Sequence, residues 1–269
     1  MKVSTLLEGL KYICCQGSTE QEVSTVVYDS RKVEENSLFI CIRGAVVDGH
    51  KFVPDVIRKG AKTLVVEEEV EAPEDVTVIK VADTRYAMAF ISAAYFGHPA
   101  EKLKTIGITG TKGKTTTTYM VKSILENAGY KVGLIGTIEA IIGEESIPAS
   151  NTTPESYLVQ EYFRKMVDAG CDCVVMEVSS QGLMLHRTQG FVLIMVSLPI
   201  LNQIISDQTS IRILMIISDA NLCCSGSVVW ELSTEMMNTL RELSKVIPVS
   251  WKLTDFHRKP TCVQKMHIW

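Results

Sequence analysis

The sequence predicts an α/β fold in two consecutive units, a small N-terminal α/β domain followed by a domain with a mostly parallel β-sheet. Three observations support this prediction. Short apolar runs alternate with stretches of helical periodicity along residues 1–192, Gly97 and Pro99 interrupt that alternation, and a glycine-rich stretch lies between a strand and a helix at residues 107–116. Strand–helix–strand alternation favours parallel strands, because each helix returns the chain to the start of the next strand.

The first unit, residues 1–98, contains four predicted strands and two predicted helices. Strands are favoured where β-branched and aromatic residues gather before a glycine or a polar turn. Helices are favoured where apolar residues recur every three or four positions and a glycine follows. The predicted strands are STVVYDSRKV (24–33), SLFICIRG (37–44), TLVVEE (63–68) and VTVIKV (76–81), and the predicted helices are FVPDVIRKGA (52–61) and TRYAMAFISAAYF (84–96).

The second unit, residues 99–192, repeats the alternation. Its last predicted strand is apolar without interruption, which is typical of a strand buried on both faces. The predicted strands are KTIGITG (104–110), KVGLIGT (131–137) and CDCVVMEVSS (171–180), and the predicted helices are TTTTYMVKSILENAG (115–129) and YLVQEYFRKMVDAG (157–170).

Composition and charge argue against a nucleic-acid-binding protein and against membrane insertion. The chain has 269 residues and a net charge of −4 with both signs interspersed, which gives no electrostatic footprint for nucleic acid. The apolar run 191–205 contains Pro199 and is shorter than the about 20 residues that span a bilayer, so we expect no membrane insertion. The N-terminus lacks the features of a signal peptide. Eight cysteines without zinc-site spacing favour reduced thiols and a cytoplasmic protein.

The glycine-rich stretch G-I-T-G-T-K-G-K-T-T predicts a phosphate site. Glycines let backbone N–H groups approach an anion, and the helix N-terminus adds donors and a favourable dipole. We expect Lys114 to reach the β- and γ-phosphates of ATP and Thr115 to place its hydroxyl on Mg²⁺. The strict pattern fails at one position, where Ile108 replaces a glycine. The predicted ATP-binding residues are Gly110, Thr111, Lys112, Gly113, Lys114, Thr115 and Thr116.

The loop variant T-G-T-K-G-K-T-T resembles that of the Mur ligases, which add amino acids to the peptidoglycan precursor. YDSRKVEENSLFICIRGAVVDGHKFVPDVIRKGA (28–61) resembles the UDP-binding N-terminal domain of that family. NTTPES (151–156) and MEVSSQGLMLHR (176–187) resemble the central-domain motifs of the members that add the third residue. The resemblance covers residues 1–192 and implies an N-terminal substrate-binding domain followed by part of a central ATP-binding domain.

The resemblance also implies roles for single residues. Ser30 would bind the UDP part of the substrate, and Glu177, at a strand end, would hold Mg²⁺ together with Thr115. The muramoyl-peptide contacts would be Thr152, Thr153, Ser179 and Arg187. From the residues alone, structural interpretations stay open. Ser30 suits a turn, the two threonines suit helix capping, and Glu177 suits an edge carboxylate in water. Leu185 stands where relatives have a polar contact, and His186 is expected to be structural or solvent-facing.

The implied reaction is ATP-dependent amide formation with Lys114 and Glu177 as catalytic residues and ATP and Mg²⁺ as cofactors. The partners would be UDP-N-acetylmuramoyl-L-alanyl-D-glutamate and either diaminopimelate or lysine, and we expect a monomer. Two alternatives remain open, a folylpolyglutamate-synthase-like ligase and a non-catalytic remnant that binds a nucleotide or UDP-sugar. The stretches YDSRKV and NTTPES argue against the folate enzyme.

Residues 193–269 differ from residues 1–192 in composition and in hydrophobic periodicity. They contain one glycine and one alanine, and their apolar residues follow neither helical nor strand periodicity. One permitted coding of residues 193–208, preceded by a single T, encodes F-D-Y-G-I-F-T-N-I-E-P-D-H-I-G-P, which has the look of the family. We therefore predict an out-of-frame tail, a poorly packed segment, an absent C-terminal ligase domain and an inactive chain.

Overall fold

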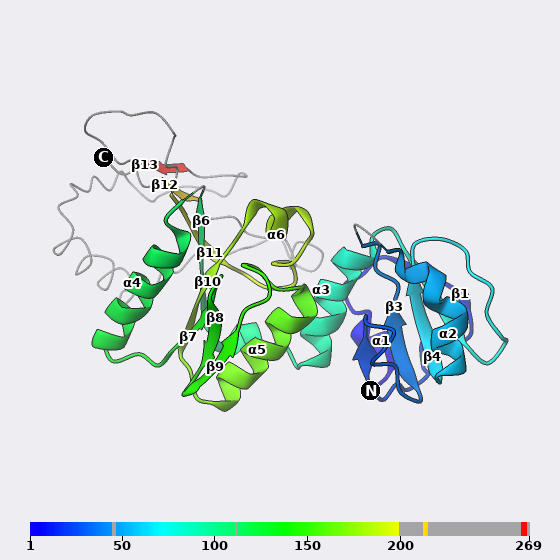
Figure 1. Cartoon of the computed structure of the whole chain (residues 1–269). Coiled ribbons are helices and arrows are strands. Elements are labelled where there is room, and N and C mark those ends of the chain that lie inside the picture. The colour runs from blue at the N-terminus through cyan, green and yellow to red at the C-terminus, as the bar shows by residue number, and fades with distance from the viewer. Residues whose placement is uncertain (45–46, 111, 199–211, 215–264, 268–269) are drawn as a thin grey trace, which may run out of the picture. The chain divides into compact units, whose positions relative to one another are not determined.

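The computed structural model describes residues 1–44, 47–110, 112–198, 212–214 and 265–267, and it has a mixed α/β architecture (Figure 1). The chain divides into two compact units. Unit 1 comprises Met1–His98, Ser156–Glu161 and Leu185–Gly190, and unit 2 comprises Pro99–Glu155, Tyr162–Met184 and Phe191–Trp269. No helix in the described part of the chain is both long and apolar enough to cross a membrane.

Unit 1 contains a five-stranded sheet in the order β1-β5-β4-β3-β2. The pairs from β2 to β5 are parallel, and β1 joins the edge antiparallel to β5. The strands are β1 (Tyr12–Gln16), β2 (Val26–Val27), β3 (Ser37–Ile40), β4 (Ala61–Val66) and β5 (Thr77–Val81). The helical segments are α1 (Val3–Leu6), the 3₁₀ turn Gly49–Phe52, α2 (Val53–Arg58) and α3 (Thr84–Tyr95).

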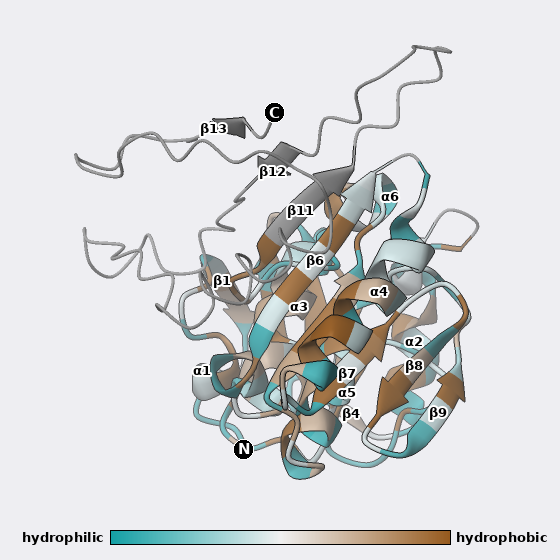
Figure 2. Cartoon of the chain, turned by 90° about the vertical axis from the view of Figure 1, so that its left-hand side faces the viewer, coloured by the Kyte–Doolittle hydropathy of each residue, from teal (hydrophilic) through white to brown (hydrophobic). Residues whose placement is uncertain are grey.

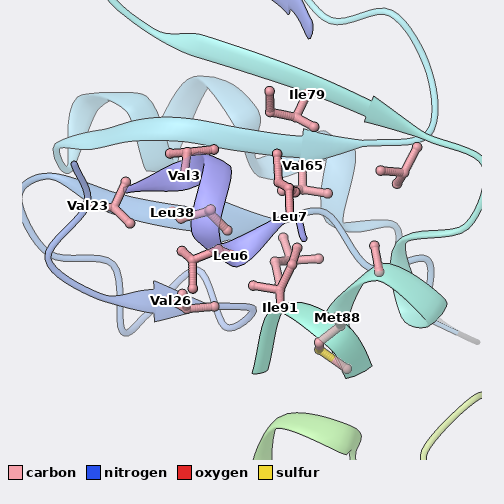
Figure 3. Packing of buried hydrophobic residues seen from close by; sticks show 13 residues of the cluster. Val3, Leu6, Leu7, Val23, Val26, Leu38, Val65, Ile79, Met88 and Ile91 are labelled. Carbon is pink, nitrogen blue, oxygen red and sulfur yellow. The ribbon is translucent and has the colours of Figure 1, made fainter. Parts of the chain in front are cut away.

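Alternating side chains of these strands form a core on each face of the sheet. Leu38 and Ile40 of β3 pack with α1 and α3, while Phe39 between them packs with α2 on the other face. This alternation follows from the period of two in a strand. Figure 3 shows the first cluster, where Leu6 of α1 and the adjoining Leu7 lie among the strand residues and α3. Both faces of the sheet are therefore covered by helices.

Unit 2 contains a sheet in the order β13-β12-β11-β6-β10-β7-β8-β9. The four central strands β11, β6, β10 and β7 are parallel, and the strands outside them are antiparallel. The strands are β6 (Lys104–Gly110), β7 (Val132–Ile135), β8 (Glu139–Ile142), β9 (Glu145–Pro148), β10 (Cys173–Glu177), β11 (Ile194–Leu198), β12 (Arg212–Leu214) and β13 (Lys265–His267).

Helices cover both faces of the central strands (Figures 1 and 2). Helix α4 (Lys114–Asn127) packs on β6, β7 and β10, and α5 (Ser156–Asp168) lies on the opposite face. A 3₁₀ turn (Pro99–Lys102) precedes β6, and the short helix α6 (Ser180–Met184) follows β10. Gly133 of β7 allows the close approach of α5, because a Cβ at that position would lie 2.4 Å from the sulfur of Met166.

The predicted fold class is confirmed. The sequence missed α1, β1, α6 and the β8–β9 hairpin, and it extended the strand at residues 24–33 well beyond β2. Residues 194–198, which open the predicted out-of-frame tail, form β11 parallel to β6. Most of that tail (199–211, 215–264 and 268–269) lies outside the described residues, so the tail assignment stays a prediction.

Candidate nucleotide-binding site

The carboxyl ends of three parallel strands of unit 2 lie at one edge of the sheet. Strand β6 ends at Gly110, β7 at Ile135 and β10 at Glu177. The register places Glu177 beside Ile108 of β6 and Met176 beside Ile135 of β7. Ligand crevices in open α/β sheets lie outside this edge, so the residues that follow each strand define the candidate site.

The glycine-rich loop joins β6 to α4 at this edge. Gly113 has a φ of 80°, in the left-handed region that favours glycine, and the helix begins at the next residue. The Lys114 ammonium donates to the carbonyl oxygen of Gly110 at 2.8 Å, so its side chain folds back along the loop. The first N–H groups of α4 have no partner within the helix and point toward this edge. Lys112, Gly113 and Thr116 are exposed, and Thr111 lies outside the described residues.

Glu177 is the buried acid of the site, with 1% of its surface exposed. Its Oε2 accepts a hydrogen bond from the Thr115 hydroxyl at 3.0 Å and one from the Thr137 hydroxyl at 3.1 Å. Its Oε1 accepts the backbone N–H of Thr137 at 2.8 Å. The strand end, the first turn of α4 and the turn after β7 therefore meet at one carboxylate.

The donor set of this carboxylate fits a divalent cation. Within the described part of the chain, every hydrogen-bond partner of the Glu177 carboxylate is a neutral hydroxyl or amide. A buried carboxylate without a cationic partner is costly, and a bound cation would compensate its charge. Carboxylate and hydroxyl oxygens are ligands that Mg²⁺ accepts, so Glu177 and Thr115 are suited to hold it.

The predicted substrate threonines lie next to Glu177. The Thr152 hydroxyl lies within hydrogen-bond distance of the Thr137 hydroxyl, at 3.1 Å. Thr153 is buried, and its hydroxyl donates to the backbone carbonyl of Glu177 at 3.0 Å and accepts the N–H of Ser179 at 2.9 Å. The Ser179 hydroxyl in turn accepts the N–H of Gly182 at 3.0 Å. Thr153 thus ties the loop before α5 to the end of β10, while Thr152 is half-buried and more accessible.

Two predicted substrate contacts, Ser30 and Arg187, belong to unit 1. Ser30 lies in the turn after β2, half-buried, and its carbonyl accepts from Lys59 at 2.9 Å. Arg187 follows His186, whose ring packs edge-on against Tyr86 and lies 3.5 Å from the Asp83 carboxylate. Their predicted roles in substrate binding stay predictions.

Thr137 was missed by the sequence-based assignment. The signal was present, since this threonine is the last residue of the predicted strand KVGLIGT, and a polar residue at a strand end belongs to the same edge as Glu177. What the sequence could not predict is the pairing of β7 with β10, which sets the two residues side by side.

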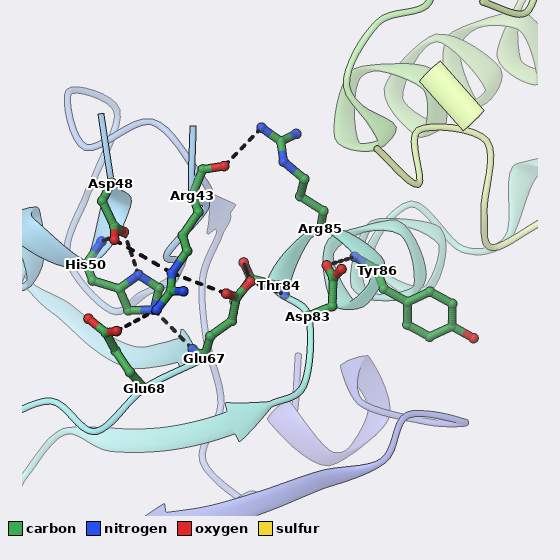
Figure 4. A network of polar contacts seen from close by, with 9 residues as sticks. All are labelled: Arg43, Asp48, His50, Glu67, Glu68, Asp83, Thr84, Arg85 and Tyr86. Atoms are coloured by element: carbon green, nitrogen blue, oxygen red, sulfur yellow. Dashed lines mark hydrogen bonds and ion pairs between the residues drawn. The ribbon is translucent and has the colours of Figure 1, made fainter. Parts of the chain in front are cut away.

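A second acidic cluster, Asp48, His50 and Glu68, has metal-ligand residue types but is held by protein groups (Figure 4). His50 Nε2 accepts the backbone N–H of Glu67 at 3.0 Å, so the ring proton is on Nδ1 and is donated to Asp48 at 2.7 Å. Glu68 pairs with the Arg43 guanidinium at 2.5 Å. Both ring nitrogens are engaged, so we assign this cluster to structure.

Two family models match the chain, and together they cover more than half of it. The model described as Mur ligase middle domain matches residues 108–204, and the model described as Mur ligase family, catalytic domain, matches residues 22–96. The first spans the phosphate loop and Glu177, and the second spans the parallel strands of unit 1.

The chain is also similar in sequence to individual curated proteins. The chain is 53% identical over 190 residues to the UDP-N-acetylmuramoyl-L-alanyl-D-glutamate–2,6-diaminopimelate ligase of Clostridium perfringens, covering 71% of this chain and 39% of the relative. It is 47% identical over 193 residues to the ligase of the same name from Clostridium tetani, covering 71% of this chain and 40% of the relative. The chain thus spans about two fifths of the length of these relatives.

A solved structure with the same enzyme name matches the fold with a TM-score of 0.62 and 20% sequence identity, over 77% of this chain and 42% of that one. The fold, the glycine-rich loop with the buried glutamate beside it, and the matches to both domain models agree. The chain belongs to the Mur ligase family.

Proposed function

We propose that this chain derives from an ATP-dependent amide ligase that adds the third amino acid to UDP-N-acetylmuramoyl-L-alanyl-D-glutamate in peptidoglycan synthesis. The observation that supports the proposal most directly is the buried Glu177 carboxylate, hydrogen-bonded to Thr115 in the first turn after the phosphate loop. The relatives are named as diaminopimelate ligases, which favours diaminopimelate over lysine as the added amino acid.

The residues of unit 2 suit the first half of this reaction. ATP would transfer its γ-phosphoryl group to the D-glutamate carboxylate of the substrate, which leaves ADP and an acyl phosphate. Lys114 and the N–H groups of α4 would neutralise charge on the transferred group. Glu177 and Thr115 would hold Mg²⁺, which supplies further positive charge at the phosphates. The Thr152 and Thr153 loop would position the acceptor carboxylate beside them.

The second half of the reaction completes the amide. The amine of diaminopimelate would attack the acyl carbon, and phosphate would leave through a tetrahedral intermediate. The substrates are a nucleotide-linked sugar peptide and free ATP, which is consistent with a cytoplasmic protein whose described cysteines are unpaired thiols. We propose that the chain acts as a monomer.

Nucleotide binding is tested first, by calorimetry with ATP and Mg²⁺. Lys114→Ala should reduce the affinity at least 10-fold, because it removes a charge-assisted contact to the phosphates. Lys112→Ala, an exposed lysine of the same loop, is the matched comparison and should have a smaller effect. Equal affinities in wild type and Lys114→Ala would mean that this loop is not a phosphate site.

Substrate class is tested by titration with the UDP-muramoyl dipeptide and, separately, with a folate. Binding of the folate alone would favour the folylpolyglutamate-synthase-like alternative. Phosphate release that depends on diaminopimelate would exclude a non-catalytic remnant, whereas binding of ATP and UDP-muramoyl dipeptide without turnover would support one.

A further inference from the structure

Thr137 makes two contacts with the Glu177 carboxylate, one to each oxygen. Its backbone N–H donates to Oε1 at 2.8 Å, and its hydroxyl donates to Oε2 at 3.1 Å. Thr137 is exposed, whereas Glu177 is almost completely buried. Two donors on one residue fix both the position and the rotation of the carboxylate, which a single donor cannot do.

The residue before Thr137 leaves the space that this arrangement needs. A Cβ on Gly136 would lie 2.7 Å from Oε1 of Glu177. The atom that it would meet is the end of a flexible side chain, so a methyl group there would move the carboxylate and leave the backbone in place. At the end of β7, Gly136 therefore leaves space for the carboxylate and Thr137 supplies the donors that hold it.

The Thr137 hydroxyl also lies 3.1 Å from the Thr152 hydroxyl. A hydroxyl has one proton and two lone pairs, so Thr137 can donate to the Glu177 carboxylate and accept the proton of the Thr152 hydroxyl at the same time. The same hydroxyl therefore joins the proposed cation site to the proposed substrate loop.

We propose that Thr137 is a positioning residue that orients Glu177 for a divalent cation. The inference rests on the proposed function, because it takes Glu177 as a cation ligand. Partners that orient a ligating carboxylate affect metal affinity although they do not touch the metal. Thr137 thus contributes to the part of ATP binding that depends on Mg²⁺, and contributes little to the part that does not.

The test compares ATP affinity with Mg²⁺ and with chelator, by calorimetry on the full chain, for wild type and three variants. Thr137→Val is nearly isosteric and lacks the hydroxyl, and it should weaken Mg²⁺-dependent binding about 10-fold while binding in chelator changes less than about 2-fold. Thr137→Ser keeps the hydroxyl and should stay near wild type. Ile138→Thr, at the exposed neighbour, is the control for a local disturbance of the turn.

Two further measurements separate the outcomes. Gly136→Ala should also weaken Mg²⁺-dependent binding, because it displaces the carboxylate while Thr137 is intact. Without nucleotide, Mn²⁺ binding measured by electron paramagnetic resonance should be weaker in Thr137→Val and Gly136→Ala than in wild type. Metal-dependent binding that is equal in wild type and Thr137→Val would overturn this inference alone. A wild-type chain that binds neither nucleotide nor cation would overturn it together with the proposed function.

Discussion

Asp29, the residue before the predicted UDP contact Ser30, forms an ion pair with Arg31. The Arg31 guanidinium donates hydrogen bonds to both Asp29 oxygens at 2.9 and 2.8 Å, and this lowers the pKa of Asp29 to about 2. Because the folded-state pKa is depressed, the ionised pair stabilises the fold above the unfolded pKa of about 4. That contribution is lost as the pH falls toward 2.

An NMR titration of the carboxylates tests this assignment. Asp29 should titrate at about 2 in the wild type. Arg31→Met removes the guanidinium and should raise the pKa of Asp29 toward its ordinary value of about 4. Asp55, whose partners are Lys59 and Arg58, serves as the internal reference and should be unaffected. A wild-type Asp29 that already titrates near 4 would contradict the geometry.

His50 has a structural role that can be separated from metal binding. Its ring joins the loop at Asp48 to the backbone of Glu67, so His50→Ala leaves the partly buried N–H of Glu67 without an acceptor. We expect a loss of about 1–3 kcal/mol in the free energy of unfolding, measured with urea. His98→Asn, at an exposed histidine with a φ of 50°, should be close to neutral. A rise in melting temperature with Zn²⁺ that depends on His50 would refute the structural assignment.

At the scale of the residue, the positions of the loop lysine after β6 and of Glu177 at the end of β10 could be predicted, because both strands are recognisable in the sequence. Their roles in binding stay predictions. The contact of Thr137 with Glu177 could not be predicted in this way, since it spans 40 positions and depends on which strands pair. The Asp48–His50 contacts depend likewise on the position of Glu67, at the end of β4.

At the scale of the element, prediction succeeded where one face of a segment is buried. Strand β6 and helices α3, α4 and α5 have clear periodicity and closing glycines, and they lie within a few residues of their predicted limits. Strand β1 gave no signal because four of its five residues are exposed. The β8–β9 hairpin extends the sheet at its edge, where β9 has little buried surface and therefore no apolar pattern.

The contact of β7 with α5 offers a test at this scale. Gly133→Ala would place a methyl group 2.4 Å from the sulfur of the fully buried Met166, and overpacking of this kind costs about 1–3 kcal/mol. In the double variant with Met166→Ala the clash is absent, so the cost of Gly133→Ala should shrink or change sign. Urea unfolding of the four proteins gives the coupling free energy. Additive costs would show that Gly133 does not limit the approach of α5.

At the scale of the whole molecule, the break at Gly97 and Pro99 predicted a first domain at residues 1–98, and this domain assignment stays a prediction. The compact unit 1 contains Met1–His98. Unit 1 also includes Ser156–Glu161 and Leu185–Gly190, which the sequence did not predict. The packing of these two segments with unit 1 depends on contacts between residues that are far apart in the sequence. Hydrophobic periodicity does not predict such contacts. Tyr157, for example, packs at 5.6 Å from Tyr28.

The apolar sequence of strand β11 explains why a change of reading frame near Leu193 need not disrupt the sheet at that point. A parallel strand that is buried in a sheet needs chiefly an apolar run, and residues 193–198 supply one. Leu193 is buried, and its side chain lies over Gly107 of β6, where a Cβ would come within 2.8 Å of it. An apolar segment can therefore pair with β6 whether or not the residues beyond it belong to the family.

We propose that a single missing base accounts for the change of sequence after Val192, and amino acids with only one codon give the strongest support. Methionine has one codon, so in the restored frame Val196 after Met195 must become glycine, and the pattern F-D-Y-G that the family resemblance leads us to expect has glycine at that position. We predict that resequencing the locus finds one further base near codon 193 and an open frame beyond it. The protein from that frame should form the amide product from the UDP-muramoyl dipeptide and diaminopimelate, and the 269-residue chain should not. If the locus is as written and the 269-residue chain adds the amino acid, the frame interpretation is wrong.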